Sequence, residues 1–263
     1  SSAENQTADQ ESTAAASANG AKDSGKESEK KKGGLKASVK DGAQNVDPSK
    51  PVTVETTGKL KSVTMTNEMG VEVKEKLSKD AKTWSTAEDL GYNHTYSIVA
   101  SDADGNKKKL SFSTPQAAGV AEVSLSPIPD SEVGVGQVIG VNFGVPITDR
   151  KAAEKTITVT TNPEVKGAFY WVNNQEVRWR PKEYWEPGTK VEVKVDQYGK
   201  DLGGGIYGGE NAKTNFTIGD RTVAIIDNAT KTMKVFKNKK FLRAIPVSLG
   251  RDYQYDTPNG RYI

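Results

Sequence analysis

The residue types that perform most enzyme chemistry are nearly absent from this sequence. Its 263 residues include no cysteine and a single histidine, His94. Without cysteine the sequence provides no thiolate nucleophile, disulfide, iron–sulfur cluster or Cys/His zinc site. A lone imidazole without a nearby carboxylate or second ligand is more often a surface or packing residue than a catalyst. We therefore assign no catalytic, cofactor-binding or metal-binding residue and expect no cofactor.

Two loops have compositions that bear comparison with ligand-binding loops. Residues 102–106 (Asp-Ala-Asp-Gly-Asn) lack the further ligands and the closing glutamate of a calcium loop, so we predict a hairpin turn. Residues 202–210 are rich in glycine, but neither a Lys-Ser/Thr ending nor a helix follows them. Phosphate binding needs that context, and we therefore predict a mobile hairpin loop instead.

Five aromatic residues lie close together in the sequence and fit either a buried core or a platform on which sugars stack. They are Tyr170, Trp171, Trp179, Tyr184 and Trp185. Neighbouring strand residues point to opposite faces, so at most one of Tyr170 and Trp171 is buried. Flanking arginines favour an inward, core position for Trp179. Carbohydrate contact by Trp171 or Trp185 stays open.

Short strands must position these residues. Apolar and polar residues alternate at 51–56, 71–75, 96–100 and 109–113, which is typical of half-buried strands. Further predicted strands are 132–135, 138–143, 156–160, 169–172, 176–180, 190–195 and 215–218. Only 148–154 is helical, and the Asn pair at 173–174 tolerates the left-handed angles of a turn. Strands at this spacing predict β-sandwiches.

Composition divides the chain into four predicted segments. Residues 1–34 have alanine as their only hydrophobic residue and cannot offset their ordering entropy by burial. We predict a disordered linker there, with a reach of roughly 30 Å. A seam of small residues and prolines separates two units of immunoglobulin size, 35–118 and 119–218. Residues 219–263 form a fourth segment of different character. The predicted fold class is all-β: two tandem immunoglobulin-like β-sandwiches after a disordered N-terminal tether, followed by an incomplete β-rich domain.

Charge and hydropathy argue against several classes of partner. The net charge of +3, from 37 basic and 34 acidic residues, is too small to predict binding to nucleic acid or to an anionic membrane. No apolar run approaches the ~18 residues that cross a bilayer. The sequence starts with Ser1-Ser2 and not with methionine, which fits either a trimmed sequence or an exported protein whose leader has been removed.

The order of motifs after Asp220 resembles one enzyme family. A strand ends in Asp227, a second contains Lys-Val-Phe at 234–236, and Pro-Val-Ser-Leu-Gly and Thr-Pro-Asn-Gly-Arg-Tyr follow. This order is similar to the opening of the L,D-transpeptidase (YkuD-type) catalytic domain. The preceding unit resembles the immunoglobulin-like domain of actinobacterial L,D-transpeptidases, and the matching stretches are 126–129, 145–149, 179–185 and 216–220. The resemblance covers residues 119–263 well and 35–118 more loosely.

The resemblance implies the N-terminal part of an exported, often lipid-anchored enzyme of the cell envelope. In this family a cysteine attacks a peptidoglycan stem peptide, forms a thioester and passes the acyl group to a second stem, which gives a 3→3 cross-link. The Ser-His-Gly-Cys motif of the family has no counterpart here, and residues 219–263 are too few to close a catalytic sheet. We therefore expect the chain to supply tether and spacer domains and to be inactive alone. Contact with a membrane is expected only through a lipidated cysteine upstream of Ser1.

Two other interpretations remain. One is a non-enzymatic protein that binds or spans the cell wall, and the tether together with the aromatic residues, as glycan contacts, favours it. The other is an adhesin-like repeat protein, which predicts further β-sandwich repeats instead of an enzyme domain. The wall-binding interpretation and the enzyme interpretation both have peptidoglycan as the partner. Neither of the two other interpretations involves nucleic acid.

Overall fold

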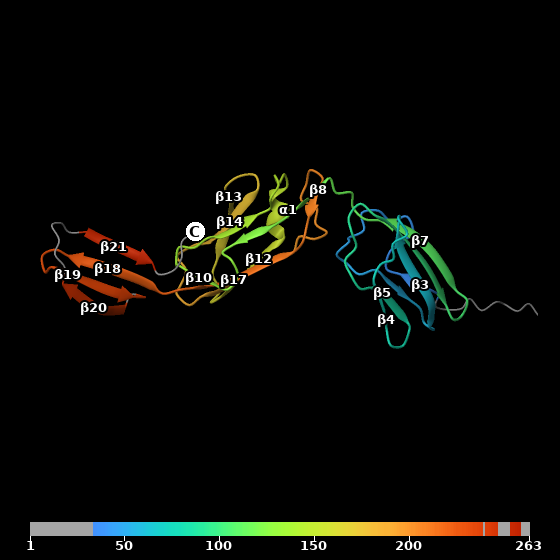
Figure 1. Ribbon diagram of the computed structural model, residues 1–263, viewed down its shortest axis with the longest axis horizontal. Coiled ribbons are helices and arrows are strands. Elements are labelled where there is room, and N and C mark those ends of the chain that lie inside the picture. Colours follow the sequence, from blue (N-terminus) through green and yellow to red (C-terminus); the bar gives the residue numbers. More distant parts are fainter. Residues whose placement is uncertain (1–33, 239, 247–252, 259–263) are drawn as a thin grey trace, which may run out of the picture. The chain divides into compact units, whose positions relative to one another are not determined.

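The computed structural model describes residues 34–238, 240–246 and 253–258 (Figure 1). Nearly every element in these ranges is a β-strand, so the predicted all-β class is confirmed. The predicted linker at 1–34 lies outside the described residues except for Gly34. Within the described ranges no helix is long and apolar enough to cross a membrane. The division at 34, 118 and 218 stays a prediction.

Residues 36–113 form two sheets that share one hydrophobic core. The strand orders are β1-β2-β5-β4 and β3-β6-β7. Val54 and Trp84 from the first sheet and Ile98 and Phe112 from the second are almost completely buried in one cluster. The strands are β1 (Lys36–Ala37), β2 (Thr53–Glu55), β3 (Leu60–Asn67), β4 (Glu75–Leu77), β5 (Thr83–Thr86), β6 (Thr95–Asp102) and β7 (Lys107–Ser113). The period-two pattern of the sequence thus places one face of each sheet inside.

A second pair of sheets encloses a core with four buried aromatic residues, Phe143, Trp179, Trp185 and Phe216. Trp179 and Trp185 have ring centroids 5.7 Å apart, and Trp185 meets Phe216 edge-on at 6.1 Å. The Trp185 Nε1–H donates to the carbonyl of Gln137 at 2.7 Å, so its polar atom is satisfied although the side chain is buried. The orders are β10-β17-β15-β12 and β13-β14-β11-β9. The strands are β9 (Ser124–Ser126), β10 (Ser131–Val133), β11 (Ile139–Asn142), β12 (Ile157–Asn162), β13 (Gly167–Trp171), β14 (Glu176–Pro181), β15 (Lys190–Val195) and β17 (Ala212–Ile218).

The helical stretch predicted at 148–154 is present as α1 (Arg150–Lys155). The carboxylate of Asp149 caps it by accepting the Ala152 N–H at 3.0 Å. A helix of this length does not persist by itself in water. Its one buried residue, Ala153, joins the core of the second sandwich, so packing against the strands holds α1 in place.

The glycine-rich segment forms a turn and also a strand that the sequence did not predict. Gly203, Gly204 and Gly205 have φ of +84°, +62° and +80°, which glycine adopts without strain. The next residues form β16 (Ile206–Gly208), which pairs in parallel with β8 (Gly119–Ala121). Gly208 lies so close to the Gln197 carbonyl that a Cβ would overlap it. The glycines therefore permit a close approach of backbones and are not a phosphate cradle.

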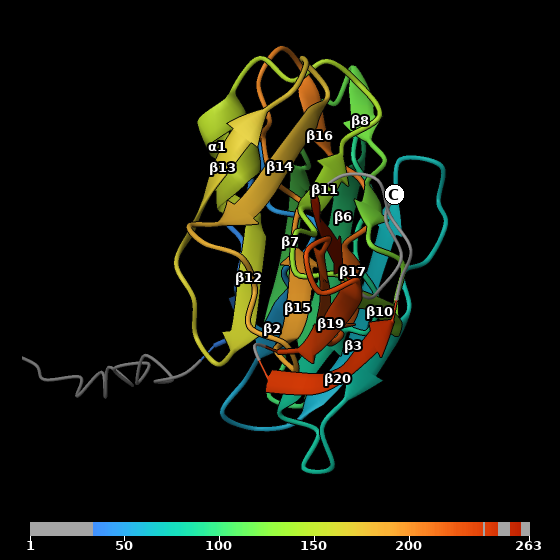
Figure 2. The same ribbon diagram turned by 90° about the vertical axis from the view of Figure 1, so that its left-hand side faces the viewer.

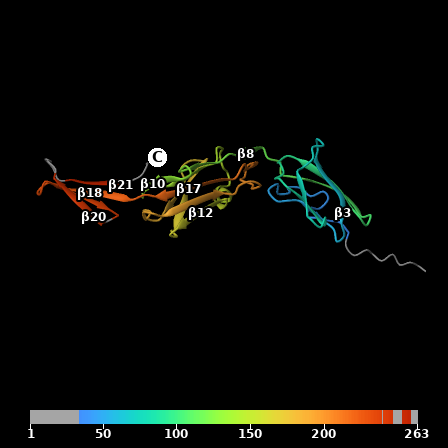
Figure 3. The same ribbon diagram turned by 60° about the horizontal axis from the view of Figure 1, so that its bottom comes forward.

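Within the described residues after 220, four strands form a further antiparallel sheet with the order β20-β19-β18-β21. Figures 2 and 3 show its red and orange strands, and in Figure 2 β19 lies beside β20. The edge strand β20 exposes Phe241 and Leu242 by 52% and 50%. Val235 is the one fully buried apolar side chain among those described in this sheet. The strands are β18 (Arg221–Asp227), β19 (Thr232–Lys237), β20 (Lys240–Pro246) and β21 (Tyr253–Pro258).

The predicted strand at 71–75 is wrong, since β4 begins only at Glu75. The side-chain oxygen of Asn67 accepts the N–H groups of Met69 and Val71 at 2.9 and 3.1 Å, which fixes a turn just before this segment. Glu72 then forms an isolated bridge with Thr66 of β3. The Asn173 turn also differs from its prediction. Asn173 has no positive φ; its side chain instead accepts two N–H groups of the following residues, both at 2.8 Å.

The hairpin turn predicted at 102–106 is confirmed. Gly105 has φ +82°, and the Asp102 carboxylate accepts the Asn106 N–H at 2.9 Å and its amide at 2.8 Å. A further bond comes from the Thr56 hydroxyl at 3.0 Å. These bonds, the Asn106 amide first, lower the pKa of Asp102. The aspartate thus fixes the turn by accepting hydrogen bonds from the protein itself.

Replacing Trp179 tests whether the second core is assembled as described. Because its side chain is 7% exposed and packs on Trp185, Trp179→Ala should lower the free energy of unfolding by roughly 3–5 kcal/mol. Chemical denaturation followed by circular dichroism measures this change. The control is Val172→Ala, at a position directly after β13 that is 42% exposed, and it should change stability by less than about 1 kcal/mol. Equal, small losses for both variants would contradict the assigned core.

Candidate functional site

His94 has a carboxylate beside it, contrary to the interpretation of an isolated imidazole. Its Nδ1 lies 2.7 and 3.0 Å from the two carboxylate oxygens of Glu68, which also accepts the Thr95 N–H at 3.2 Å. The backbone N–H of Glu68, followed by the His94 ring, lowers the pKa of the Glu68 carboxyl. The pair was missed because 26 residues separate its members, and only the β3–β6 register joins them.

The pair does not complete a catalytic arrangement. In the part of the chain that the structure describes, the His94 ring has hydrogen bonds to Glu68 alone, and no serine or threonine hydroxyl contacts it. The same residues include no cluster of three or more metal-ligating side chains. The carboxylate orients the imidazole, but neither a nucleophilic side chain nor a second metal-ligating side chain contacts the ring among the described residues.

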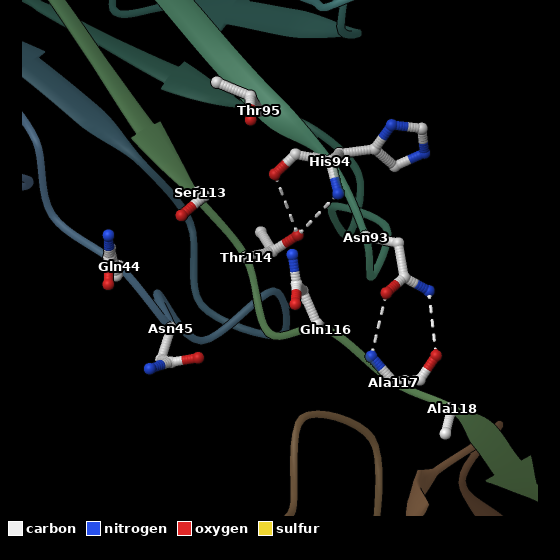
Figure 4. A pocket seen from close by; sticks show the side chains of 10 residues that line it. All are labelled: Gln44, Asn45, Asn93, His94, Thr95, Ser113, Thr114, Gln116, Ala117 and Ala118. Atoms are coloured by element: carbon white, nitrogen blue, oxygen red, sulfur yellow. Dashed lines mark hydrogen bonds between the residues drawn. The ribbon is translucent and has the colours of Figure 1, made fainter. Parts of the chain in front are cut away.

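A cavity of about 730 Å³ lies beside this pair, at one end of the sheet β3-β6-β7 (Figure 4). Sites for small molecules usually have volumes of this order. Gln44 and Asn45 lie on one side in this view, and Asn93 and His94 lie on the other, with the imidazole ring turned away from the two amides. The lining residues are Gln44, Asn45, Asn93, His94, Thr95, Ser113, Thr114, Gln116, Ala117 and Ala118. The lining carries amides and hydroxyls but no aspartate, glutamate, lysine or arginine.

Backbone hydrogen bonds fix the two sides of this cavity. Segment 42–46 runs along the edge of β7, where the Val46 N–H donates to the Ser113 carbonyl at 3.0 Å. This pairing presents Gln44 and Asn45 to the cavity, and Asn45 has φ +54°, a left-handed angle that asparagine tolerates best among non-glycine residues. No local sequence pattern indicated this site, because its residues come from three separate stretches of the chain, 44–45, 93–95 and 113–118.

The opposite wall is held by an asparagine clamp. Asn93, also left-handed at φ +60°, accepts the Ala117 N–H at 2.8 Å and donates to the Ala117 carbonyl at 3.2 Å. The Thr114 hydroxyl lies close by and donates to the Gly91 carbonyl at 2.6 Å. These bonds tie the loop before β6 to the segment after β7, so the cavity wall is preorganised.

Tyr92 adjoins this wall and belongs to a group of three partly buried tyrosines. Its ring centroid is 5.1 Å from that of Tyr198 and 5.3 Å from that of Tyr207. The Tyr92 hydroxyl donates to the Gly208 carbonyl at 2.7 Å and accepts the Gly199 N–H at 2.6 Å, and the Tyr198 hydroxyl donates to the carbonyl of Leu90. Burial raises the pKa of Tyr198 to about 12, so these hydroxyls stay protonated donors.

The outward face of β3, β6 and β7 continues the uncharged lining of the cavity. Val63, Ile98 and Leu110 point into the core, so the alternate residues face outward. Eight of these carry a hydroxyl, and we call them the hydroxyl face: Ser62, Thr64, Thr66, Thr95, Ser97, Ser101, Ser111 and Ser113. Val99, Lys107 and Lys109 are the other outward residues of β6 and β7. Thr95 and Ser113 belong to both the face and the cavity.

The hydroxyl face differs from a typical solvent-exposed sheet face in the same chain. On β15 the outward residues are Lys190, Glu192 and Lys194, and the last two form an ion pair at 3.2 Å. On the hydroxyl face, cross-strand neighbours such as Ser62 and Ser101 share a hydroxyl–hydroxyl bond of 2.9 Å instead. The two sheets therefore meet water with different chemistry although both bury their inner faces.

The aromatic residues in the second sandwich contribute mainly to its core. Trp179 is buried as predicted, and Trp185 is only 2% exposed, so a sugar cannot stack on its ring. Trp171 is partly buried; it stacks on Phe143 at 6.1 Å, and the guanidinium of Arg150 lies 5.1 Å from its ring centroid. The aromatic platform considered from the sequence is therefore excluded at Trp185 and largely covered at Trp171.

The His94–Glu68 contact leads to a titration experiment. In a His94→Ala variant the pKa of Glu68 should rise toward its ordinary value, because one hydrogen bond to the carboxylate is lost. A carboxyl group whose pKa is lower in the folded than in the unfolded state stabilises the fold at pH values above the unfolded pKa, and this stabilisation is lost as the pH falls through the folded pKa. In the variant, the contribution of Glu68 to the loss of stability at acid pH should therefore shrink. Carbon NMR of the carboxyl groups measures both. Asp80, whose pKa is lowered chiefly by the Ser78 hydroxyl, serves as the internal control. A Glu68 pKa unchanged by the substitution would contradict the contact.

Comparison with known proteins shows that the chain belongs to a family of bacterial immunoglobulin-like domains and is similar to mycobacterial L,D-transpeptidases. Residues 43–201 match the family described as Bacterial Ig domain. The chain is 45% identical over 233 residues to L,D-transpeptidase 2 of Mycobacterium tuberculosis (strain CDC 1551 / Oshkosh), which covers 87% of this chain and 57% of that protein. It is 31% identical over 219 residues to L,D-transpeptidase 5 of Mycobacterium tuberculosis (strain ATCC 25618 / H37Rv), and the match covers 80% of this chain and 49% of that protein. The chain thus spans about half the length of these relatives.

Solved structures give a similar but shorter match. A structure of the LD transpeptidase LdtMt1 in complex with imipenem is 33% identical to the chain and covers 50% of it and 55% of its own length, with a TM-score of 0.36. A second structure, of an L,D-transpeptidase from Mycobacterium smegmatis, is 27% identical to the chain. The match covers 50% of this chain and 54% of that structure, with a TM-score of 0.34.

Proposed function

Because the chain belongs to the bacterial Ig domain family and is homologous to mycobacterial L,D-transpeptidases, we propose that it is the spacer-bearing portion of a peptidoglycan L,D-transpeptidase. The observation that carries this proposal is the 45% identity extending over 87% of the chain. The activity of the whole protein, 3→3 cross-linking of stem peptides through a cysteine acyl-enzyme, is part of the proposal.

The composition and the core structure support a spacer role for these residues. The sequence has no cysteine, so this stretch supplies no thiolate for acyl transfer. Its two sandwiches bury continuous apolar cores, and the one histidine is oriented by Glu68 without a nucleophile beside it. We therefore propose that residues 1–263 alone are inactive and that the sandwiches position a catalytic domain toward its substrate.

A place in the cell envelope follows from the proposed substrate. Peptidoglycan lies outside the cytoplasmic membrane, so a protein that acts on it is exported, and a lipidated cysteine upstream of Ser1 is proposed as its anchor. Fractionation of cells carrying the natural gene, combined with mass spectrometry of the mature N-terminus, tests both parts. Recovery from the cytosol would contradict export, and an unlipidated mature protein would contradict the anchor.

The second candidate function is non-catalytic binding to the cell wall. The uncharged cavity at Gln44, Asn93 and Gln116 favours it, since amides and hydroxyls suit a neutral ligand. Trp185 no longer favours it, because its side chain is buried. Further β-sandwich repeats in the natural gene, in place of a cysteine-containing domain, would support the adhesin-like alternative instead.

Deleting the natural gene tests the proposed enzyme function. Mass spectrometry of digested cell walls should show fewer 3→3 cross-links in the deletion strain, since one enzyme that forms them is lost. The gene restored with its predicted catalytic cysteine should recover them, and the gene with that cysteine changed to serine should not. An unchanged proportion of 3→3 cross-links in a strain without related enzymes would contradict the function.

The isolated chain should not react with a carbapenem. Acylation needs a cysteine thiolate, and residues 1–263 have none. Intact-protein mass spectrometry after incubation should show the mass of the free chain only. A cysteine-containing L,D-transpeptidase treated in parallel is the positive control. A covalent adduct on the chain would show that another nucleophile acts and would overturn the spacer assignment.

A further inference from the structure

We propose that the hydroxyl face and the adjoining cavity form a binding site for a neutral saccharide chain, namely the glycan strand of peptidoglycan. The saccharide chemistry is argued from the residues of the first sandwich. Only the identity of the polymer rests on the proposed function. Nothing in the cysteine chemistry of the relatives requires such a site, so the sandwich would add a second contact with the wall.

The chemistry of the face matches that of a sugar. Each sugar hydroxyl both donates and accepts a hydrogen bond, and so does each serine or threonine hydroxyl, while a carboxamide offers separate donor and acceptor atoms. The hydroxyl face presents Ser97 opposite Ser111 and Thr95 opposite Ser113, in successive cross-strand pairs. Thr66 lies opposite Ser97 on the other side, so one row of three hydroxyls crosses the sheet. The next outward row, Thr64, Val99 and Lys109, has one hydroxyl, so the hydroxyls are densest at the end of the sheet that adjoins the cavity.

The cavity gives this face a defined end. Thr95 and Ser113 lead from the sheet into it, where Gln44, Asn45 and Gln116 replace hydroxyls by carboxamides. The side chains of these three residues are exposed and make no hydrogen bond to the described part of the chain. Their amides are thus available to a ligand, whereas the Asn93 amide is already used to hold Ala117.

Charge distribution favours a neutral ligand over a charged one. Lys107 and Lys109 are the charged outward residues of β6 and β7, and Lys109 lies opposite Val99. Glu68 lies at the cavity end, where it is paired with His94. Asp41 borders the β7 edge and accepts the Ser111 N–H at 2.9 Å. The row of Thr66, Ser97 and Ser111 carries no charged side chain, so a strongly anionic or cationic polymer would find no complementary charge in that row. Hydrogen bonding, and not charge, must therefore select the ligand.

Solubility alone does not require such a face. β15 meets water through lysine and glutamate, and opposite charges on neighbouring outward positions stabilise a sheet. Serine does not favour strands as β-branched and aromatic residues do, and five of the eight hydroxyl residues are serines. The face therefore lacks the stabilisation that opposite charges would provide. A ligand that forms hydrogen bonds with these hydroxyls would account for their presence on this face.

The affinity of one face should be low and that of the polymer higher. The described part of the face offers Val99 as its apolar contact and no exposed aromatic ring on which a sugar could stack. An insoluble glycan presents many identical segments close together, so rebinding raises the apparent affinity. Retention on the polymer is therefore the sensitive assay.

The test uses purified residues 1–263 and insoluble glycan strands from which an amidase has removed all stem peptides. The face variant is Ser97→Glu with Ser111→Lys, which creates a cross-strand ion pair in place of two hydroxyls and should preserve the fold. The cavity variant is Asn45→Gly with Gln116→Ala, and glycine accepts the left-handed angle at 45. Each should reduce the binding constant about tenfold, because two hydrogen-bonding groups are lost.

The control variant, Glu192→Ser with Lys194→Ser on β15, should bind as the unchanged chain does. Circular dichroism confirms that every variant is folded. Wild-type chain that is not retained by the stripped glycan, or variants that bind equally well, would overturn the proposal. Retention by intact peptidoglycan but not by stripped glycan would assign binding to stem peptides and overturn it too. None of these results affects the cross-link measurement, which tests the enzyme function separately.

Discussion

The burial of one face of every sheet is the constraint on which the rest of this structure depends. Each buried valine, leucine or isoleucine contributes about 1.5–3 kcal/mol, and the two sandwiches bury most of theirs in two separate clusters. Because the side-chain period of a strand is two, filling a core fixes which residues face outward. The hydroxyl face and the charged face of β15 are therefore both consequences of the same pattern. What differs between them is the chemistry that the sequence places at the outward positions.

The same constraint explains why much of the fold could be predicted from the sequence. Alternation located β6, β7, β14, β15 and most of the other strands, and flanking arginines correctly placed Trp179 inside. Where no alternation exists, prediction failed: β16 forms because glycines let its backbone approach Gln197 closely. The alternation at 71–75 did not give a continuous strand, because the Asn67 side chain fixes a turn just before it and Glu72 forms an isolated bridge with Thr66. Local hydrogen bonding outweighed the pattern.

The candidate site could not be predicted, since it exists only through register and pairing. Glu68 and His94 meet because β3 and β6 pair antiparallel, and Gln44 reaches the cavity because segment 42–46 follows the edge of β7. Neither relation has a local signature. Of the five aromatic residues that attracted attention in the sequence, Trp179 and Trp185 are buried and Trp171 is partly buried, while Tyr170 and Tyr184 are exposed. The sequence therefore indicated the family through its motifs, but it did not indicate the residues of the cavity and the hydroxyl face.

A division of labour follows for this part of an L,D-transpeptidase. The cysteine chemistry of the proposed enzyme needs a cysteine that these residues do not supply. The first sandwich instead offers an uncharged, preorganised surface that would keep a wall polymer nearby. Holding the protein on the glycan would raise the local concentration of stem peptides without any contact to the reacting atoms. The spacer and the binding surface are then one structure with an inner and an outer face.

The most direct measurement is an NMR titration of the isotopically labelled chain with a soluble oligomer of N-acetylglucosamine. Amide and side-chain shifts should change in β3, β6, β7 and segment 42–46, with those of Thr95, Ser97 and Ser113 among the largest. The signals of β15 should stay in place. Shift changes confined to the second sandwich, or none at saturating oligomer, would contradict the account.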